Sequence, residues 1–410
     1  MKIHLSDNKM ILIQKKVKYF TISLKIVLLL ITLNGCMNDN FNNKINLNKI
    51  GKIIDLKLSD IVVGLRWVAL ETNPHCLIGI DCRYYMNDKY ILTFDQNKIL
   101  QFSGDGKFIR ELSKQGKGPN QFIAVRTFTV NDEKEILYFQ DHGKYNAIYA
   151  IDLKNGKYLP KILLPNTIVL NTMSLINDSI FICASSNNPE NGFSIFSMDI
   201  NGNVKFGFRH QKKQTKGPTL IPKRNEIIQN NNLYLFHEGN ALFQISEMEM
   251  EEIFFVDVPT VNINRSSKGK ICTTFAGNCD YILYKVNQFN VLKTQKGTSV
   301  TSGESELYLT LIKNELKSYK VRLLENNLLK NSEDKDITNR LNQFNNGHVL
   351  IPYNRFELKE NLNNNITMHP PDNNGTNILK DNPILLTGII KDNVKINNIN
   401  QKKKEKISKK

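Results

Sequence analysis

The fold class is decided by residues 99–110, which read Ile-Leu-Gln-Phe-Ser-Gly-Asp-Gly-Lys-Phe-Ile-Arg. Short runs of aliphatic and aromatic residues lie on both sides of Asp105-Gly106. Asp-Gly pairs tolerate the positive φ angles that tight hairpin turns require. The stretch therefore predicts two antiparallel β-strands joined by a turn.

The same arrangement occurs twice more along the chain. Asn155-Gly156 and Asn201-Gly202 each lie between two apolar runs, and the three turn glycines are 50 and 46 residues apart. One four-stranded blade of a β-propeller occupies about 40–50 residues. No long segment has the 3.6-residue apolar period of a helix. The sequence therefore predicts an all-β protein made of repeated four-stranded units.

Six such units are expected. Strands of the first three are expected at Ile78–Tyr85, Tyr90–Phe94, Ile99–Phe102, Lys107–Leu112, Val125–Val130, Ile136–Phe139, Val169–Ile176 and Ile180–Ala184. Strands of the last three are expected at Glu226–Gln229, Leu233–Phe236, Ala241–Ile245, Ile253–Val258, Leu307–Ile312, Ser318–Leu324 and His348–Ile351. Ile53–Leu58 is expected to supply the missing strand of the sixth unit, because closing the ring removes an open edge strand.

Three segments carry a resemblance to a known family. They are Trp67–Thr72, the segment Phe108–Arg110 running into Gly116–Phe122, and Asp381–Leu386. They resemble the TolB-like six-bladed β-propeller lipoproteins of Bacteroidetes-type bacteria, which are related in architecture to NHL-repeat propellers. The resemblance covers residues 50–392, is poor from Thr260 to Glu304, and implies a six-bladed propeller of four-stranded blades. It implies no particular biochemical activity.

The amino-terminal residues have the pattern of a sorting signal. Lys15, Lys16 and Lys18 precede a mainly apolar run from Ile22 to Leu33. This pattern is typical of a secretory signal, and the run is shorter than the roughly 20 apolar residues of a membrane-spanning helix. The run ends in Leu33-Asn34-Gly35-Cys36, which resembles the lipobox of bacterial lipoproteins. We therefore expect a signal peptide at 1–35 and lipid attachment at Cys36.

The remaining boundaries follow from composition. Residues 36–49 are rich in Asn and predict a flexible tether, and the Lys-rich residues 393–410 predict a disordered tail. Two acyl chains hold a protein stably on a membrane, so the propeller is expected in the cell envelope, on the periplasmic or the surface face of the outer membrane.

The net charge of +16 first suggests a nucleic-acid partner. However, residues 1–35 carry +5 and residues 391–410 carry +6, which leaves +5 for the 355 residues between them. The body is only mildly basic, so no nucleic-acid partner is expected.

None of the sequence patterns that commonly mark catalytic or metal sites is complete in this chain. The Gly-rich segment Lys114–Phe122 lacks the Gly-Lys-Ser/Thr of a phosphate-binding loop, so it predicts a turn between two units. The chain has many Asn and Asp residues, most of them at expected turns, and calcium favours such oxygen ligands. A calcium site in the propeller channel therefore remains an alternative. No Gly-x-Ser-x-Gly occurs. Zinc is disfavoured because no His-x-x-x-His occurs among the histidines, which are His4, His75, His142, His210, His237, His348 and His369.

The cysteines other than Cys36 give no Cys-x-x-Cys. Export permits disulfides, and Cys76–Cys82 and Cys272–Cys279 are the candidate local pairs. Cys183 is expected to be buried within a strand.

Three functional hypotheses remain. The first is a non-enzymatic envelope protein that binds a peptide, protein or glycan on a propeller face, since loops on a rigid scaffold suit recognition. The alternative is a metal-dependent hydrolase or lyase with its site in the propeller channel. The third is an assembly role within an envelope complex. No catalytic, cofactor-binding or metal-ligating residue is nominated from the sequence, and no cofactor is expected.

Overall fold

The residues that the computed structural model describes form six β-sheets, four with four strands and two with five. All of these strands lie in one compact unit, residues 44–410. The structure describes residues 44–50, 52–79, 82–164, 168–176, 178–187, 195–208, 227–230, 233–238, 241–245, 249–257, 267–277, 280–294, 297–312, 316–327, 337, 344–345, 348–353 and 382–391.

Three consecutive sheets are simple antiparallel meanders in which each strand pairs with the next along the chain. The first contains β4 (Arg83–Met86), β5 (Tyr90–Phe94), β6 (Lys98–Ser103) and β7 (Phe108–Lys114). The second contains β8 (Val125–Asn131), β9 (Ile136–Asp141), β10 (Lys144–Asp152) and β11 (Lys157–Leu163). The third contains β12 (Val169–Ile176), β13 (Ile180–Asn187), β14 (Ile195–Asp199) and β15 (Val204–Phe208).

The other three sheets each receive a strand from the amino-terminal segment. β1 (Lys44–Asn46) joins β16 (Ile227–Asn230), β17 (Leu233–Glu238), β18 (Ala241–Ile245) and β19 (Met250–Asp257). β2 (Ile53–Lys57) joins β20 (Ser267–Gly277), β21 (Tyr281–Thr294), β22 (Gly297–Leu311) and β23 (Lys317–Glu325). β3 (Val62–Ala69) joins β24 (Phe344–Asn345), β25 (His348–Tyr353) and β26 (Ile384–Ile390). Two short helices, η1 (Leu47–Lys49) and α2 (Leu58–Ile61), connect β1, β2 and β3.

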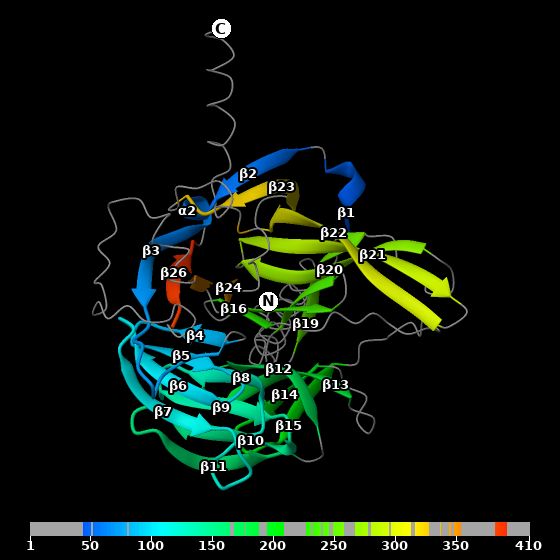
Figure 1. Cartoon of the computed structure of the whole chain (residues 1–410). Helices are drawn as coiled ribbons and strands as arrows, with labels where there is room; N and C mark the ends of the chain where they lie inside the picture. Colours follow the sequence, from blue (N-terminus) through cyan, green and yellow to red (C-terminus); the bar gives the residue numbers. More distant parts are fainter. Residues whose placement is uncertain are drawn as a thin grey trace, which may run out of the picture. The chain divides into compact units, whose positions relative to one another are not determined.

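The sheets follow one another through contacts between their first strands. β8 contacts β12, β12 contacts β16, β16 contacts β20, β20 contacts β24, and β25 of the last sheet contacts β4 of the first. In Figure 1 the labels of β4, β8, β12, β16 and β24 lie toward the middle of the view, and β7, β11 and β23 lie farther out. The inner strands are therefore β4, β8, β12, β16, β20 and β24, as in a β-propeller, and β1, β2 and β3 lie at the outer edges of their sheets.

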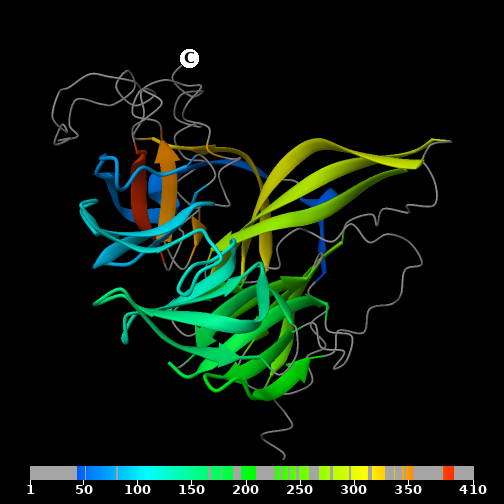
Figure 2. The ribbon, with the colours of Figure 1, turned by 60° about the horizontal axis from the view of Figure 1, so that its bottom comes forward.

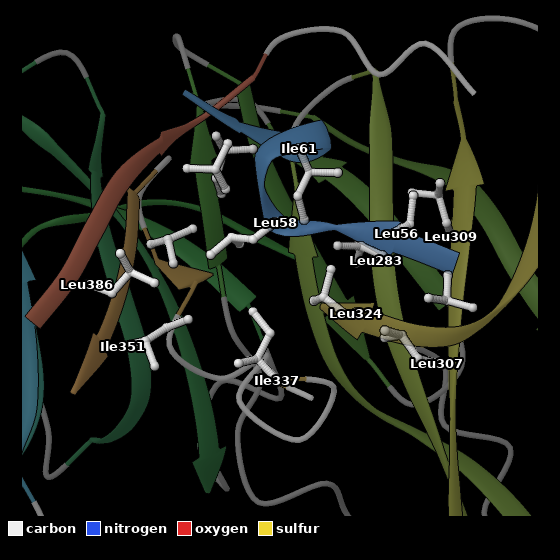
Figure 3. Packing of buried hydrophobic residues seen from close by; sticks show 14 of the residues in the cluster. Leu56, Leu58, Ile61, Leu283, Leu307, Leu309, Leu324, Ile337, Ile351 and Leu386 are labelled. Carbon is white, nitrogen blue, oxygen red and sulfur yellow. The ribbon is translucent and has the colours of Figure 1, made fainter. Parts of the chain in front are cut away.

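The segment Ile53–Leu58 does not close the sixth unit, so that prediction is wrong. Its strand, β2, pairs in parallel with β23 of the preceding sheet. Leu56 and Leu58 are fully buried in a cluster that also contains Leu309, from the β2–β23 sheet, and Leu386, from the next sheet (Figure 3). This segment fills the space between two sheets, and β3 supplies the outer strand of the last sheet by pairing antiparallel with β26.

The turn glycines have a second role besides their backbone conformation. Gly106, Gly156 and Gly202 have φ angles of 91°, 74° and 88°, which confirms the turn chemistry expected for Asp-Gly and Asn-Gly. In addition, a Cβ on Gly106 would lie 2.2 Å from the Ala69 carbonyl oxygen, and one on Gly202 would lie 2.2 Å from that of Leu163. The turns at Gly106 and Gly202 therefore pack directly against the outer strands β3 and β11 of the neighbouring sheets.

Most predicted strands are observed, with some shifts in their bounds. β12 and β18 coincide with the predicted Val169–Ile176 and Ala241–Ile245. The strand predicted for Ile78–Tyr85 begins at Arg83 instead. The predicted tether at 36–49 includes β1 and η1.

Strands β21 and β22 have 14 and 15 residues, and Figure 2 shows these yellow strands extending beyond the other sheets. They fall in the region where the family resemblance was poor. Residues 1–35, Cys36 and the tail at 393–410 lie outside the described residues.

Candidate ligand-binding site

The inner strands β4, β8 and β12 lie side by side and run in the same direction. Near their beginnings, Arg83 of β4 bonds to β8, and Arg126 of β8 bonds to β12. Near their other ends, the Tyr85 hydroxyl donates a 2.6 Å hydrogen bond to Asp132. We call the side where these strands begin the loop end, because connections from the preceding sheets arrive there. We call the opposite side the turn end, because short turns there lead to the next strand.

Arg83 lies at the loop end, at the first position of β4. Its guanidinium donates to the carbonyl oxygens of Val125 and of Arg126, the latter at 2.9 Å. The guanidinium carbon lies 5.3 Å from the centre of the Phe128 ring, and Phe128 stacks on Phe94 with ring centres 3.8 Å apart. Because β8 is paired on one side only, these bonds satisfy carbonyl groups on its inner edge.

Arg126 repeats this arrangement one sheet further on. Its Nε donates to the Leu170 carbonyl oxygen at 2.7 Å, and one terminal nitrogen donates to the Asn171 side chain at 3.1 Å. Both arginine side chains are half-buried. These bonds run to neutral backbone and amide oxygens and fix the position of each guanidinium group on the neighbouring inner strand.

Two buried aspartates fix the loops around this end. Asp141 is fully buried, and its Oδ1 accepts from the backbone N–H groups of Ile123, Ala124 and Gly143. Asp95 holds the equivalent place one sheet earlier and accepts from the N–H groups of Asn97, Lys98 and Gly79. Each carboxylate therefore ties a turn to the loop that arrives from the preceding sheet.

The segment Gly116–Phe122 forms the connection between β7 and β8, as the sequence predicted. The Gln121 side-chain oxygen accepts from the Gly118 N–H at 2.8 Å and fills the space where a Cβ on Gly116 would lie. Asn120 has a positive φ of 59°. Phe122 is fully buried, whereas Lys117 points to solvent. The loop is thus anchored at its end and offers a cationic side chain at its tip.

A pair of rings lies beside the start of β8. The backbone N–H of His142 donates to the carbonyl oxygen of Ala124, which lies two residues before Arg126, at 2.7 Å. The Tyr145 hydroxyl lies 3.1 Å from Nδ1 of His142, and the two ring centres are 5.6 Å apart. His142 is exposed and Tyr145 is half-buried. These rings and the arginines together form a polar, cationic surface at the loop end.

The turn end carries acidic side chains. Asp132 accepts from Tyr85 and from the Asn87 side chain, at 2.6 and 2.7 Å. Glu133 approaches Asp178 of the next sheet, and a hydrogen bond and charge repulsion between the two carboxyl groups raise the pKa of Glu133. Burial lowers the pKa of His348, against the carboxylates of Asp88 and Asp132, which raise it.

The remaining candidate residues are scattered. Cys76 and Cys82 are free thiols; Cys76 donates to the Glu71 carbonyl oxygen at 3.1 Å, and burial raises the pKa of Cys82 to about 12. Cys183 is buried within β13, as predicted. The side chain of Cys272 and all of Cys279 lie outside the described residues, as do His4, His210 and His369.

The described part of the chain contains no cluster of side chains that could bind a metal ion. No group of three or more His, Cys, Asp or Glu side chains is placed there to hold an ion. His75 and His142 are exposed on loops, His237 lies in β17, and His348 lies in β25.

Sequence reasoning missed Arg83 and Arg126. They are 43 residues apart, one in each of two successive inner strands. That spacing of cationic residues at one repeat length is the signal that could have found them.

Comparisons with solved structures found proteins of similar fold. A structure of a Bacteroides fragilis protein that is named as exported matches with a TM-score of 0.54 and 14% identity, over 83% of this chain and all of that one. A DUF4221-family protein of Bacteroides vulgatus matches with a TM-score of 0.45 and 10% identity, over 81% of this chain and 99% of that one. The β-propeller domain of Myceliophteria thermophila Cps50 (Swd1) matches with a TM-score of 0.34 and 12% identity, over 64% and 87% of the two chains. None of the curated proteins matches the chain.

In the described residues, no helix has the length and apolar character needed to cross a membrane. The meandering four-stranded sheets and the ordered inner strands have the architecture of a β-propeller. The family described as "Domain of unknown function (DUF4934)" matches residues 42–387, which is most of the sequence. The chain therefore belongs to the DUF4934 family.

Proposed function

We propose that this protein is a lipid-anchored envelope protein whose propeller binds a ligand at the loop end and does not catalyse a reaction. The observation that carries the proposal is the pair Arg83 and Arg126. Their bonds to neighbouring backbone hold two half-buried cations in fixed positions. A preorganised charge beside anchored loops suits recognition, because little side-chain freedom is lost when a ligand binds.

We further propose that the propeller has six blades in a closed ring. Six sheets, the contacts between successive inner strands and the pairing of β3 with β26 support this reading. A closed ring leaves no sheet edge facing a gap, which explains why the amino-terminal segment contributes the last strand.

The anchor is the third part of the proposal. Cys36 ends the lipobox-like segment, and seven residues separate it from Lys44, where β1 begins. Seven extended residues span at most about 25 Å. A lipidated Cys36 would therefore hold the propeller close to the membrane.

The anchor is tested by labelling the full chain with an alkyne fatty acid in a bacterial host. We expect label and membrane association for the natural chain and loss of both for Cys36→Ala. A labelled Cys36→Ala chain would refute the assignment of Cys36.

The binding role is tested by ligand-induced thermal stabilisation of the full chain against a varied set of saccharides and peptides. We expect the ligand that stabilises the natural chain to have a much smaller effect on Arg126→Gln. Lys154→Gln, an exposed change at the turn end, is the matched control and should bind normally. Equal stabilisation of all three chains would move binding away from the loop end.

A further inference from the structure

The charges at the loop end point to the class of ligand. We propose that the loop end binds an acidic saccharide, with its carboxylate held by Arg126 and Arg83 and a sugar ring against Tyr145 and His142. This inference rests on the proposed binding function and specifies its ligand.

The first argument is electrostatic. Among the described residues at this end, Asp95 and Asp141 are buried and accept backbone N–H groups. Two exposed carboxylates lie farther off: Glu71 accepts from the Phe108 N–H beside the Gly106 turn, and Glu111 lies in the middle of β7. The cationic side chains are exposed or half-buried: Arg83, Lys98, Lys114, Lys117, Arg126 and Lys144. The described residues of the loop end therefore carry an excess of positive charge, which attracts anions.

The second argument is the hydrogen-bonding capacity of Arg126. The Nε–H group donates to the Leu170 carbonyl oxygen, and one N–H of a terminal nitrogen donates to the Asn171 side chain. A guanidinium has five N–H donors, so Arg126 keeps donors beyond those that its described contacts use. A carboxylate accepts two such donors at once, which makes it the anion whose geometry fits.

The third argument separates a saccharide from an acidic peptide. A peptide is usually bound through pockets that receive apolar side chains. The exposed side chains around this end are mostly amides and paired rings. Two large apolar side chains are also exposed among the described residues there, Ile123 in the link between β7 and β8 and Leu163 at the end of β11, and they belong to separate segments rather than to one apolar pocket. Amides pair with hydroxyl groups and ring faces cover the C–H face of a sugar. The exposed amides are Gln96, Asn97, Gln115, Asn120 and Asn146.

The test is calorimetric titration of the full chain, purified in mild detergent, with an oligogalacturonate. A neutral maltooligosaccharide and a poly-glutamate of similar length are titrated in parallel. We expect the oligogalacturonate to bind, with affinity falling as salt is raised. Arg126→Gln should weaken binding at least about tenfold and Arg126→Lys less, because Lys keeps the charge but not the two parallel donors.

Two further variants guard against misfolding. Tyr145→Ala should weaken binding by about fivefold, because a ring contact is lost, without touching the bonds of Arg126. Lys154→Gln should stay within about twofold of the natural chain, because it lies at the turn end. Circular dichroism confirms that each variant is folded before titration.

The outcomes are distinct. Poly-glutamate binding as tightly as the oligogalacturonate, with the same dependence on Arg126, would overturn the saccharide class in favour of an acidic peptide. A maltooligosaccharide that binds equally well and ignores Arg126→Gln would overturn the anionic class but leave a binding protein. Failure of all three probes would refute the acidic-saccharide assignment, whereas the proposed function would still be judged by the wider ligand set.

Discussion

The two ends of the inner strands show how one repeat serves two purposes. At the turn end, glycine turns pack against neighbouring backbone and carboxylates of adjacent sheets bond to tyrosine and asparagine. At the loop end, buried aspartates accept backbone N–H groups of the loops, and amides, rings and cationic side chains are exposed or half-buried. Changes at the turn end should therefore alter stability, and changes to exposed residues at the loop end should alter binding.

The largest effect is expected for Gly106→Ala at the turn end. The new Cβ would lie 2.2 Å from the Ala69 carbonyl oxygen, and the backbone has a positive φ of 91°. We expect a loss of about 3 kcal/mol in the free energy of unfolding, measured by urea denaturation. Gly64→Ala is the matched control, because Gly64 also has a positive φ but no atom near a Cβ. It should lose about 1 kcal/mol, the strain alone, and equal losses would refute the packing argument.

A somewhat smaller loss in the free energy of unfolding is expected for substitutions of Asp141, which anchors the loops at the loop end. Asp141→Ala leaves three backbone N–H groups without their acceptor. The cost should be about 2–3 kcal/mol in urea denaturation, because unsatisfied buried donors are expensive. Asp141→Asn keeps an acceptor oxygen and should lose less than half of that. If both variants were as stable as the natural chain, Asp141 would have no anchoring role.

Tyr85→Phe removes one hydroxyl at the turn end and keeps the ring. The lost bond to Asp132 is 2.6 Å long, and burial together with that carboxylate raises the pKa of Tyr85. We expect a loss of about 1–2 kcal/mol by thermal or urea denaturation. Binding at the loop end should be unchanged, and a large binding defect in a folded Tyr85→Phe would contradict the separation of the two ends.

The smallest effect concerns pH. Burial lowers the pKa of His348, so the unfolded chain takes up this proton more readily than the folded chain. Neutral His348 therefore contributes to the free energy of unfolding. This contribution is complete above the ordinary histidine pKa of about 6.5 and is lost as the pH falls through that value toward the lowered pKa of the folded chain. Urea midpoints at pH 7.5 and 5.5 should therefore differ less in His348→Gln than in the natural chain. An unchanged difference would exclude His348 as a contributor.

Local features of the fold could be predicted from the sequence because short-range chemistry determines them. The turns at Gly106, Gly156 and Gly202 follow from residues that tolerate positive φ, and the strands Val169–Ile176 and Ala241–Ile245 were located from their apolar pattern. The link between β7 and β8 was also expected, since the segment lacked the residues of a phosphate-binding loop.

Long-range features could not be predicted in the same way. Ile53–Lys57 pairs in parallel with a strand more than 260 residues away, and nothing in a period-two pattern specifies the partner. The bonds of Arg83 and Arg126 cross from one sheet to the next, so they depend on a register that a single sequence does not reveal. The loop-end surface therefore became visible only with the structure.

The most direct test of this account is hydrogen–deuterium exchange of the full chain with and without saturating oligogalacturonate. We predict slower exchange at residues 115–126 and 141–146, at the loop end, and no change at residues 132–135 and 152–156, at the turn end. Protection confined to the turn end would contradict the assignment of the ligand to Arg83 and Arg126.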